Sequence, residues 1–111
     1  MSDCLFCKIV AGEIPSSKVF ENENVYAFRD INPLAKEHYL FISKNHSKNF
    51  LQMDNQEILD VLSAIKSFAK DKNLEEPGLR VVTNVNKLAG QTVFHTHFHV
   101  LAGEQLKGFG A

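Results

Sequence analysis

The stretch Gly90-Gln91-Thr92-Val93-Phe94-His95-Thr96-His97-Phe98-His99-Val100-Leu101 governs how the rest of the chain is interpreted. Its three histidines alternate with Thr96 and Phe98. A period of two is typical of a β-strand, so we expect the three imidazoles on one face. Same-face neighbours lie roughly 7 Å apart, which is too far for imidazole–imidazole hydrogen bonds but suits a row lining a small anion such as phosphate.

Three interpretations of this histidine row compete. It can be a surface strand with solvated histidines, a His-x-His-x-His chelate for a divalent metal, or a catalytic or phosphate-binding row. An expression tag is disfavoured, because the histidines are interrupted and lie in an apolar, β-prone run. We favour the catalytic or phosphate-binding row.

Size and composition set the general class of protein. A chain of 111 residues with 44% apolar residues predicts one globular domain. The net charge of −1 argues against a polyanion-binding surface, and so against a nucleic-acid partner. We find no apolar run that could cross a membrane and no signal peptide. We therefore expect a cytoplasmic protein with reduced cysteines.

The chain predicts an α+β fold with a five-stranded antiparallel sheet. The segment 4–12 predicts a short helix, with Ser2 or Asp3 as its cap and Gly12 in the position just after its end. Periodicity of the apolar residues predicts one long helix over 54–72, started by a capping arrangement of Asp54 and Glu57. The expected strands cover 18–21, 25–29, 79–85 and the histidine row, and residues 36–46 contain one more strand around the apolar run at 39–42.

Cys4 and Cys7 form a Cys-x-x-Cys pair with three interpretations. A thioredoxin-like redox motif is disfavoured, because no strand precedes it. The pair can be two small core thiols, or half of a tetrahedral zinc site completed by two of the histidines at 38, 46, 95, 97 and 99.

The segment His95-Thr96-His97-Phe98-His99-Val100-Leu101 resembles the signature of the histidine triad (HIT) superfamily. The flanking Gly90-Gln91-Thr92-Val93 and Ala102-Gly103-Glu104-Gln105-Leu106 are similar to its Hint-like nucleotide-binding branch, in the bacterial type with an N-terminal Cys-x-x-Cys. The resemblance covers nearly the whole chain. It implies a single HIT domain over residues 1–111, which forms a homodimer with a continuous ten-stranded sheet.

The resemblance also implies a site for a purine nucleotide such as AMP. Apolar residues of the first helix would help form the nucleobase pocket, and Asp30 and Ile31 would meet the nucleoside. The Asp30 carboxylate could accept from both ribose hydroxyls, although it can equally be a plain turn residue. The remaining substrate-binding residues would be Leu5, Phe6, Ile9, Phe28, Asn84, Gly90, Gln91, Thr92 and Val93. The last five would meet phosphate or leaving group, with Thr92 where the family more often has Ser.

The implied chemistry is hydrolysis of nucleoside 5′-phosphoramidates or related AMP conjugates. His97 would attack the α-phosphorus, while His99 and His38 stabilise charge on the phosphate. His95 would be structural, joining Cys4, Cys7 and His46 in a structural zinc site, and no catalytic cofactor would be needed. The histidine at position 99 favours hydrolysis over transfer, because the nucleotidyltransferase branch usually has Gln there.

Other functions stay open from sequence alone. They are a dinucleoside polyphosphate hydrolase, a noncatalytic purine nucleotide-binding protein, and a metal-binding module. The short tail lacks the Trp-Pro-Pro ending common in Hint-like relatives, and Phe109 is the residue that could take part of its place.

Overall fold

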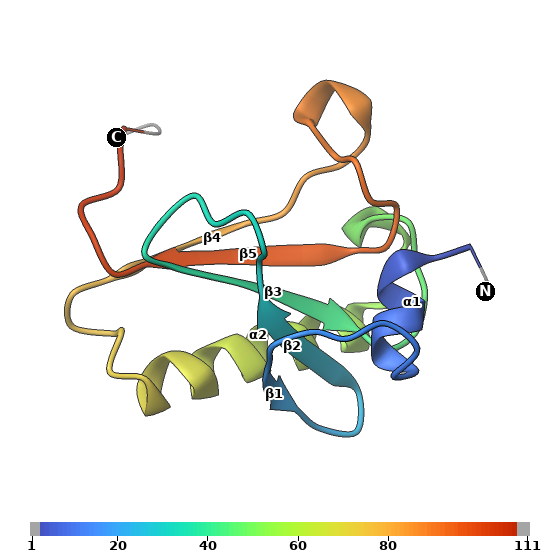
Figure 1. Ribbon diagram of the computed structural model, residues 1–111, viewed down its shortest axis with the longest axis horizontal. Coiled ribbons are helices and arrows are strands. Elements are labelled where there is room, and N and C mark those ends of the chain that lie inside the picture. Colours follow the sequence, from blue (N-terminus) through green and yellow to red (C-terminus); the bar gives the residue numbers. More distant parts are fainter. Residues whose placement is uncertain (1–2, 109–111) are drawn as a thin grey trace.

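The computed structural model describes residues 3–108, which form one five-stranded antiparallel sheet and two α-helices (Figure 1). The strands are β1 (Lys18–Glu21), β2 (Val25–Arg29), β3 (Glu37–Ser43), β4 (Leu79–Val82) and β5 (His97–Ala102). Their order across the sheet is β1-β2-β3-β5-β4. The predicted fold class is therefore confirmed. Within the described residues, no helix is both long and apolar enough to cross a lipid bilayer.

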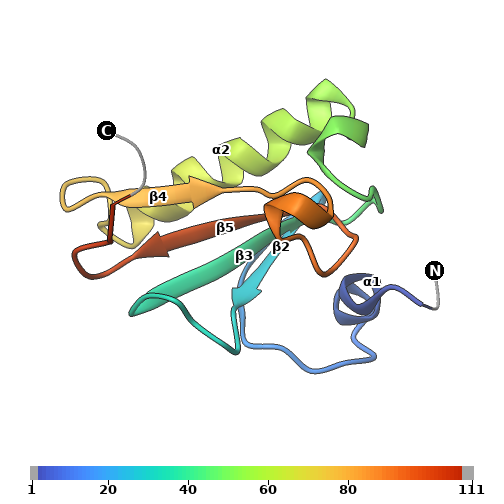
Figure 2. The ribbon, with the colours of Figure 1, turned by 90° about the horizontal axis from the view of Figure 1, so that it is seen from above.

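The two helices lie on opposite sides of the sheet (Figure 2). The long helix α2 (Asn55–Asp71) packs on one side, and its Phe68 ring contacts Tyr39 and Phe41 of β3 edge-on. On the other side, Phe6 and Ile9 of the short helix α1 (Leu5–Val10) pack against Phe28, Leu40 and neighbouring apolar residues. Strand alternation supplies both cores, since successive side chains of β2 and β3 point to opposite faces.

Helix α2 matches its sequence pattern closely. Glu57 accepts a hydrogen bond from the backbone N–H of Asp54 at 3.1 Å, as expected for residues at the start of a helix. Val61, Ala64, Ile65, Phe68 and Ala69 are buried on one stripe. Leu62, next to Val61, is 39% exposed and lies at the edge of this stripe.

The start of α1 differs from the prediction. Cys4 is its N-cap residue, and the Cys4 sulfur accepts a hydrogen bond from the Cys7 N–H at 3.2 Å. Asp3 therefore does not cap the helix, while Ser2 lies outside the described residues, as does Phe109. Gly12 follows the C-cap and has a φ of +81°, which few other residues adopt.

Strands β4 and β5 are shorter than predicted. β4 ends at Val82 and β5 begins at His97, so Asn84 and His95 lie in the connecting segment. This segment bonds to the loop after β3 instead of continuing the β-ladder, because the Thr96 N–H donates to the Ser47 carbonyl at 2.8 Å. The prediction that all three histidines share one strand face is therefore wrong for His95 and confirmed for His97 and His99.

Candidate active site

His97 and His99 lie side by side on the α1 face of the sheet. Their backbones pair with Ile42 and Leu40 of β3, and the alternate residues Phe98 and Val100 are buried toward α2. The two imidazole centroids are 5.0 Å apart. The site is thus built near the middle of the sheet, where neighbouring strands on both sides fix the backbone.

His99 makes a direct hydrogen bond to a histidine outside the triad. His38, at the start of β3, places its Nε2 2.9 Å from Nδ1 of His99. The Leu34 N–H donates to Nδ1 of His38 at 3.0 Å, so the proton of the neutral His38 ring is on Nε2. His38 therefore donates to His99, and the proton of the neutral His99 ring is on Nε2. That N–H is a donor of the kind that a phosphate oxygen accepts.

The same accounting assigns the protons of His97. Its Nδ1 lies 2.8 Å from the backbone carbonyl oxygen of His95. A carbonyl only accepts, so Nδ1 carries the proton and Nε2 keeps a free lone pair. His97 is therefore oriented as a nucleophile or general base at Nε2.

Burial keeps these imidazoles neutral. Loss of hydration lowers the pKa of His97 and that of His38 from the ordinary value, although the Asp30 carboxylate opposes this in both. Burial, together with the neighbouring His97 and His38, lowers the pKa of His99 to about 4. Near neutral pH the site thus holds three uncharged histidines with assigned tautomers.

Asp30 stands at the edge of this histidine cluster. Its Oδ2 lies 3.4 Å from Nε2 of His38, while its Oδ1 accepts a hydrogen bond from the Asn32 N–H at 2.8 Å. Asp30, His38 and His99 also lie close enough together to hold a metal ion. However, the hydrogen bond from His38 to His99 uses the His99 Nδ1 lone pair, which favours a hydrogen-bonded relay over a chelate.

The apolar residues expected at the nucleobase divide into buried and exposed ones. Phe6 contacts Phe28 edge-on at a centroid distance of 5.5 Å and His97 at 5.1 Å. The apolar cluster beside His97 therefore contains Phe6, Phe28 and Ile9. Leu5 is 43% exposed and Ile31 90% exposed, so their side chains are open to a ligand.

In the glycine-containing loop before the triad, the Gln91 side chain bonds to the backbone, whereas the sequence predicted that it would meet the phosphate or leaving group. Gly90 has a φ of +94° and ends the short 3₁₀ helix η2 (Lys87–Ala89). The buried Gln91 side chain donates to the Lys48 and Val93 carbonyls at 2.6 and 3.1 Å and accepts from the Asn86 N–H at 2.7 Å. Its amide is therefore occupied with holding the loop, and it is no free donor for phosphate.

Three of the residues expected to meet the phosphate or leaving group remain to be placed, Asn84, Thr92 and Val93. Asn84 is half-buried just after β4, next to Thr83, whose hydroxyl donates to the His97 carbonyl at 2.8 Å. Thr92 is exposed and Val93 packs against the apolar cluster of Phe6.

Cys4, Cys7, His46 and His95 converge in a second cluster, with their ligand atoms within 4.8 Å of one another. Nδ1 of His95 lies 3.2 Å from the Cys4 sulfur and 3.5 Å from the Cys7 sulfur, and Nδ1 of His46 lies 3.5 Å from Cys7. Tetrahedral zinc with ordinary Zn–S and Zn–N bonds would separate sulfur from nitrogen by about 3.6 Å.

The second ring nitrogen of His95 supports the same fit. Nε2 donates to the Ser43 carbonyl at 2.8 Å, which leaves the Nδ1 lone pair directed at the two sulfurs. Histidine ligands of zinc commonly have such a carbonyl partner. Burial and the neighbouring Cys4 raise the pKa of Cys7 to about 11, so metal binding would have to displace its thiol proton. The residues present fit a structural zinc ion.

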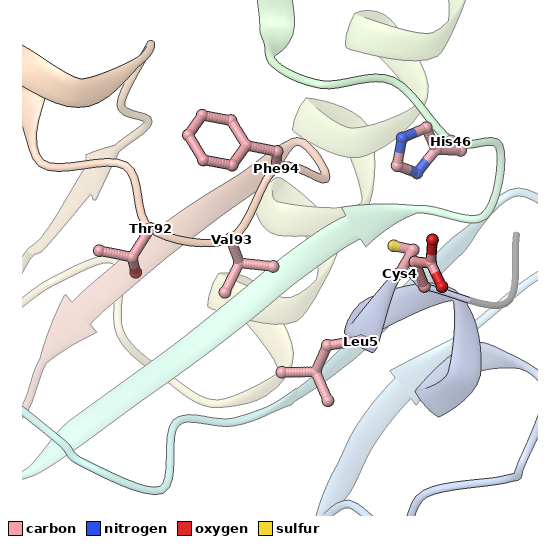
Figure 3. A pocket seen from close by; sticks show the side chains of 7 residues that line it. Cys4, Leu5, His46, Thr92, Val93 and Phe94 are labelled. Atoms are coloured by element: carbon pink, nitrogen blue, oxygen red, sulfur yellow. The ribbon is translucent and has the colours of Figure 1, made fainter.

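A cleft of about 700 Å³ opens beside this cluster. Figure 3 shows Leu5 and Cys4 of the α1 region on one side, Thr92, Val93 and Phe94 of the loop on the other, and His46 at one end. Asp3 completes the lining. Leu5 and Phe94 are both nearly half exposed.

Sequence reasoning missed the groups that orient the histidines. Leu34, Ser43 and Ser47 act through backbone atoms. Ser47 and Thr96 also share a buried hydroxyl contact at 2.6 Å. Only the polar Thr96 in an apolar run offered a signal, because backbone donors and acceptors leave no trace in residue type.

Comparison with known proteins identifies the class to which this fold and site belong. The sequence matches the HIT domain over residues 11–106, and the chain belongs to this family. It is 45% identical to an uncharacterized HIT-like protein of Borreliella burgdorferi, over 99% of this chain and 82% of that protein. It is 37% identical to an adenosine 5′-monophosphoramidase of Candida albicans, over 90% of this chain and 70% of that enzyme.

The solved structures agree. A HIT family hydrolase from Clostridium thermocellum superposes with a TM-score of 0.92 at 39% identity, covering 98% of this chain and 97% of that one. The protein is therefore a member of the HIT family, and this family includes hydrolases.

Proposed function

We propose that the protein hydrolyses nucleoside 5′-phosphoramidates or related AMP conjugates at the α-phosphate, through a nucleotidyl-histidine intermediate. The observation that carries this proposal is the hydrogen bond from Nδ1 of His97 to the His95 carbonyl. It leaves Nε2 of a neutral, buried imidazole unprotonated, beside His99 with its proton on Nε2. The similarity to the adenosine 5′-monophosphoramidase of Candida albicans supports the choice of substrate.

The reaction has two steps that need only water as a co-reactant. In the first, Nε2 of His97 forms a bond to phosphorus as the P–N bond breaks, and the amine leaves with the electron pair and takes up a proton from solvent water. In the second, water attacks phosphorus, the bond to His97 breaks, and AMP and a proton are released. The His99 N–H, preplaced by His38, stabilises the charge on the phosphate oxygens in both steps.

Other groups bind the substrate. Asp30 accepts from the ribose hydroxyls, and Leu5, Ile31 and the rings of Phe6 and Phe28 surround the nucleobase. Asn84, Thr92 and the backbone of Gly90 and Val93 meet the phosphate or the leaving group. The structure supports only an indirect part for Gln91, which holds the loop.

We further propose a structural zinc ion on Cys4, Cys7, His46 and His95, which would hold α1 against the loop that carries His95. No catalytic cofactor takes part. The protein would act in the cytoplasm as a homodimer, through the exposed edge of β4, where Val81 is 42% exposed. It would have no nucleic-acid or membrane partner. Sedimentation analysis measures the dimer directly.

The decisive experiment compares wild type with His97→Ala on adenosine 5′-phosphoramidate, with excess chelator present. We expect AMP release by the wild type and a loss of at least about a thousandfold in the variant, because the nucleophile is absent. AMP binding to the variant, measured by calorimetry, controls for folding. Activity that survives in His97→Ala would refute the covalent mechanism.

The same experiment separates two alternatives. A noncatalytic nucleotide-binding protein would bind AMP and release none from the phosphoramidate. A metal chelate of His95, His97 and His99 is disfavoured, because His95 faces the cysteines while His97 and His99 lie on the sheet. A dinucleoside polyphosphate hydrolase would prefer a diadenosine substrate in the same assay.

A further inference from the structure

Two buried hydroxyl groups lie next to the segment that carries His97, and the reaction described above uses neither. Thr96 is 2% exposed, and Ser47, in the segment after β3, is 9% exposed. Their hydroxyl oxygens are 2.6 Å apart. Burial of a hydroxyl is costly unless it is hydrogen-bonded, so each of these groups depends on the other.

The peptide group between His95 and Thr96 connects this pair to His97. Its N–H belongs to Thr96 and donates to the Ser47 carbonyl at 2.8 Å. Its carbonyl belongs to His95 and accepts from Nδ1 of His97 at 2.8 Å. The peptide group is planar and rigid, so a rotation that weakens one of these hydrogen bonds also weakens the other.

The Thr96 hydroxyl adds a further bond on the Ser47 side. Its Oγ1 donates to the Ser47 carbonyl at 3.2 Å, in addition to its contact with the Ser47 hydroxyl. Thr96 precedes the paired part of β5, which faces β3 from His97 onward. These bonds to Ser47 therefore hold the peptide group at a point where the β-ladder does not.

The His95 carbonyl matters more during the reaction than before it. When Nε2 of His97 bonds to phosphorus, the ring already has a proton on Nδ1 and becomes positively charged. The Nδ1–H group is then a stronger donor, and a carbonyl aligned with it stabilises the transition state more than the free enzyme. The hydrogen bond to Ser47 at the other end of the peptide polarises this carbonyl further.

We propose that Thr96, together with Ser47, is a positioning residue for the nucleophile. It holds the peptide between residues 95 and 96 so that the His95 carbonyl stays aligned with Nδ1 of His97 during the attack. This inference rests on the proposed nucleotidyl-histidine mechanism. The two hydroxyls act through the peptide group and not on the substrate, so their loss should affect kcat and the proton position of His97 more than KM.

The kinetic test removes the hydroxyl and keeps the shape of the side chain. On adenosine 5′-phosphoramidate, Thr96→Val should lower kcat by about tenfold and change KM by less than about twofold, because the nucleophile is less well oriented. Thr96→Ser keeps the hydroxyl and should stay within about twofold of the wild-type kcat. The double variant Thr96→Val with Ser47→Ala leaves neither hydroxyl without its partner, and it replaces Thr96→Val if that variant does not fold.

A spectroscopic test reports on His97 without any substrate. The ¹⁵N chemical shifts of the ring nitrogens show which nitrogen carries the proton, and the spectrum of His97→Gln assigns the signals. In the wild type we expect the proton of the neutral ring on Nδ1. In Thr96→Val, part of the population should have it on Nε2, because the carbonyl acceptor is less well aligned.

The matched control removes a hydroxyl contact elsewhere. Ser16, in the segment between α1 and β1, lies 2.7 Å from the Tyr26 hydroxyl. Ser16→Ala should lower the melting temperature while leaving kcat and the proton position of His97 unchanged. Ser47 and Thr96 adjoin His46 and His95 of the proposed zinc site, so the proteins are compared at equal measured metal content.

The outcomes separate this proposal from the proposed function. If Thr96→Val melts at a lower temperature but keeps the wild-type kcat and the proton on Nδ1, the hydroxyls serve folding only; the proposal is overturned and the phosphoramidase function stands. A loss of kcat in Thr96→Ser equal to that in Thr96→Val overturns it too, because the retained hydroxyl gives no rescue. If the wild type cleaves no phosphoramidate, the proposed function fails, and the ring-proton measurement alone decides whether Thr96 positions His97.

Discussion

Asp30 has two possible partners at once, the ribose hydroxyls and His38. Its Oδ2 is 3.4 Å from Nε2 of His38, which itself donates to His99. A carboxylate in this place favours the orientation and the positive character of the His38–His99 pair. Its removal should therefore affect chemistry as well as binding.

A substrate without ribose hydroxyls separates these two effects. With 2′,3′-dideoxyadenosine 5′-phosphoramidate, Asp30→Asn should still lower kcat by about tenfold, equal to about 1.4 kcal/mol in the barrier. With the ribose substrate the variant should also raise KM. Steady-state kinetics of both proteins on both substrates measures the split. An unchanged kcat on the dideoxy substrate would limit Asp30 to ribose binding.

The buried histidines also make stability depend on pH. Burial lowers the pKa of His99 from 6.5 to about 4, so between these values the unfolded chain binds a proton that the folded chain does not. Stability is therefore fully present above about pH 6.5 and falls as the pH drops toward 4. His38 and His97 have lowered pKa values too and act in the same direction.

We expect the free energy of unfolding to fall between pH 7 and pH 5, by up to about 1.4 kcal/mol per pH unit for each such histidine. In His99→Gln, whose amide oxygen can still accept from His38, the fall should be smaller. Urea unfolding with chelator present measures both slopes. Equal slopes in the two proteins would show that His99 takes up its proton equally in the folded and unfolded states.

At the scale of elements, the loop from Asn86 to Thr96 is organised by one side chain. The buried Gln91 amide serves three backbone groups, from Asn86, Lys48 and Val93. Such local bonds join η2, the segment after β3 and the start of the triad. The loop that brings Thr92 and Val93 to the site is thus held by side-chain bonds where no strand pairing is available.

Replacing Gln91 by Leu should destabilise the protein by about 2 kcal/mol, because it removes three hydrogen bonds that the buried Gln91 amide makes to partly buried backbone groups. Gln56→Leu is the matched control, since Gln56 is exposed and donates only to Asp60 on the surface of α2. It should change the free energy of unfolding by less than about 0.5 kcal/mol. Denaturant unfolding compares the two, and equal values would mean that the loop is held by other contacts.

The elements were largely predictable, because apolar periodicity reports which face of a strand or helix is buried. His97 and His99 share a face with period two, and α2 follows its stripe from Val61 to Ala69. His95 departs from this pattern because its ring bonds to Ser43 and faces Cys4. The hydrogen bond between His38 and His99 depends on the pairing of β3 with β5, which residue spacing does not specify.

For the whole molecule, the cysteine–histidine cluster is a second link between α1 and the rest of the fold, beside the packing of Phe6 and Ile9 on the sheet. Two of its members precede or belong to α1, one follows β3, and one precedes β5. A metal ion there would join three separate segments. It would stabilise the folded state by about 2.7 kcal/mol when free metal exceeds its dissociation constant a hundredfold.

We expect one zinc ion per chain, and its removal by a strong chelator should lower the melting temperature. Cys7→Ser and His46→Ala should lose the ion, whereas Asn45→Ala, an exposed neighbour outside the cluster, should keep it. Metal analysis and calorimetry measure both effects, and cobalt substitution reports sulfur ligands by its absorption. A wild-type protein that binds neither ion would leave Cys4 and Cys7 as plain thiols.

The ring protons of His38, His95 and His97 are placed by main-chain atoms: the Leu34 N–H and the carbonyls of Ser43 and His95. Exchange of one side chain for another at positions 34 and 43 leaves these atoms in place. Substitutions at both positions therefore leave the tautomers of His38 and His95 unchanged. Proline at position 34 is the one genetically encoded change there that deletes the donor, and a backbone ester introduced by chemical synthesis would delete it without altering any side chain.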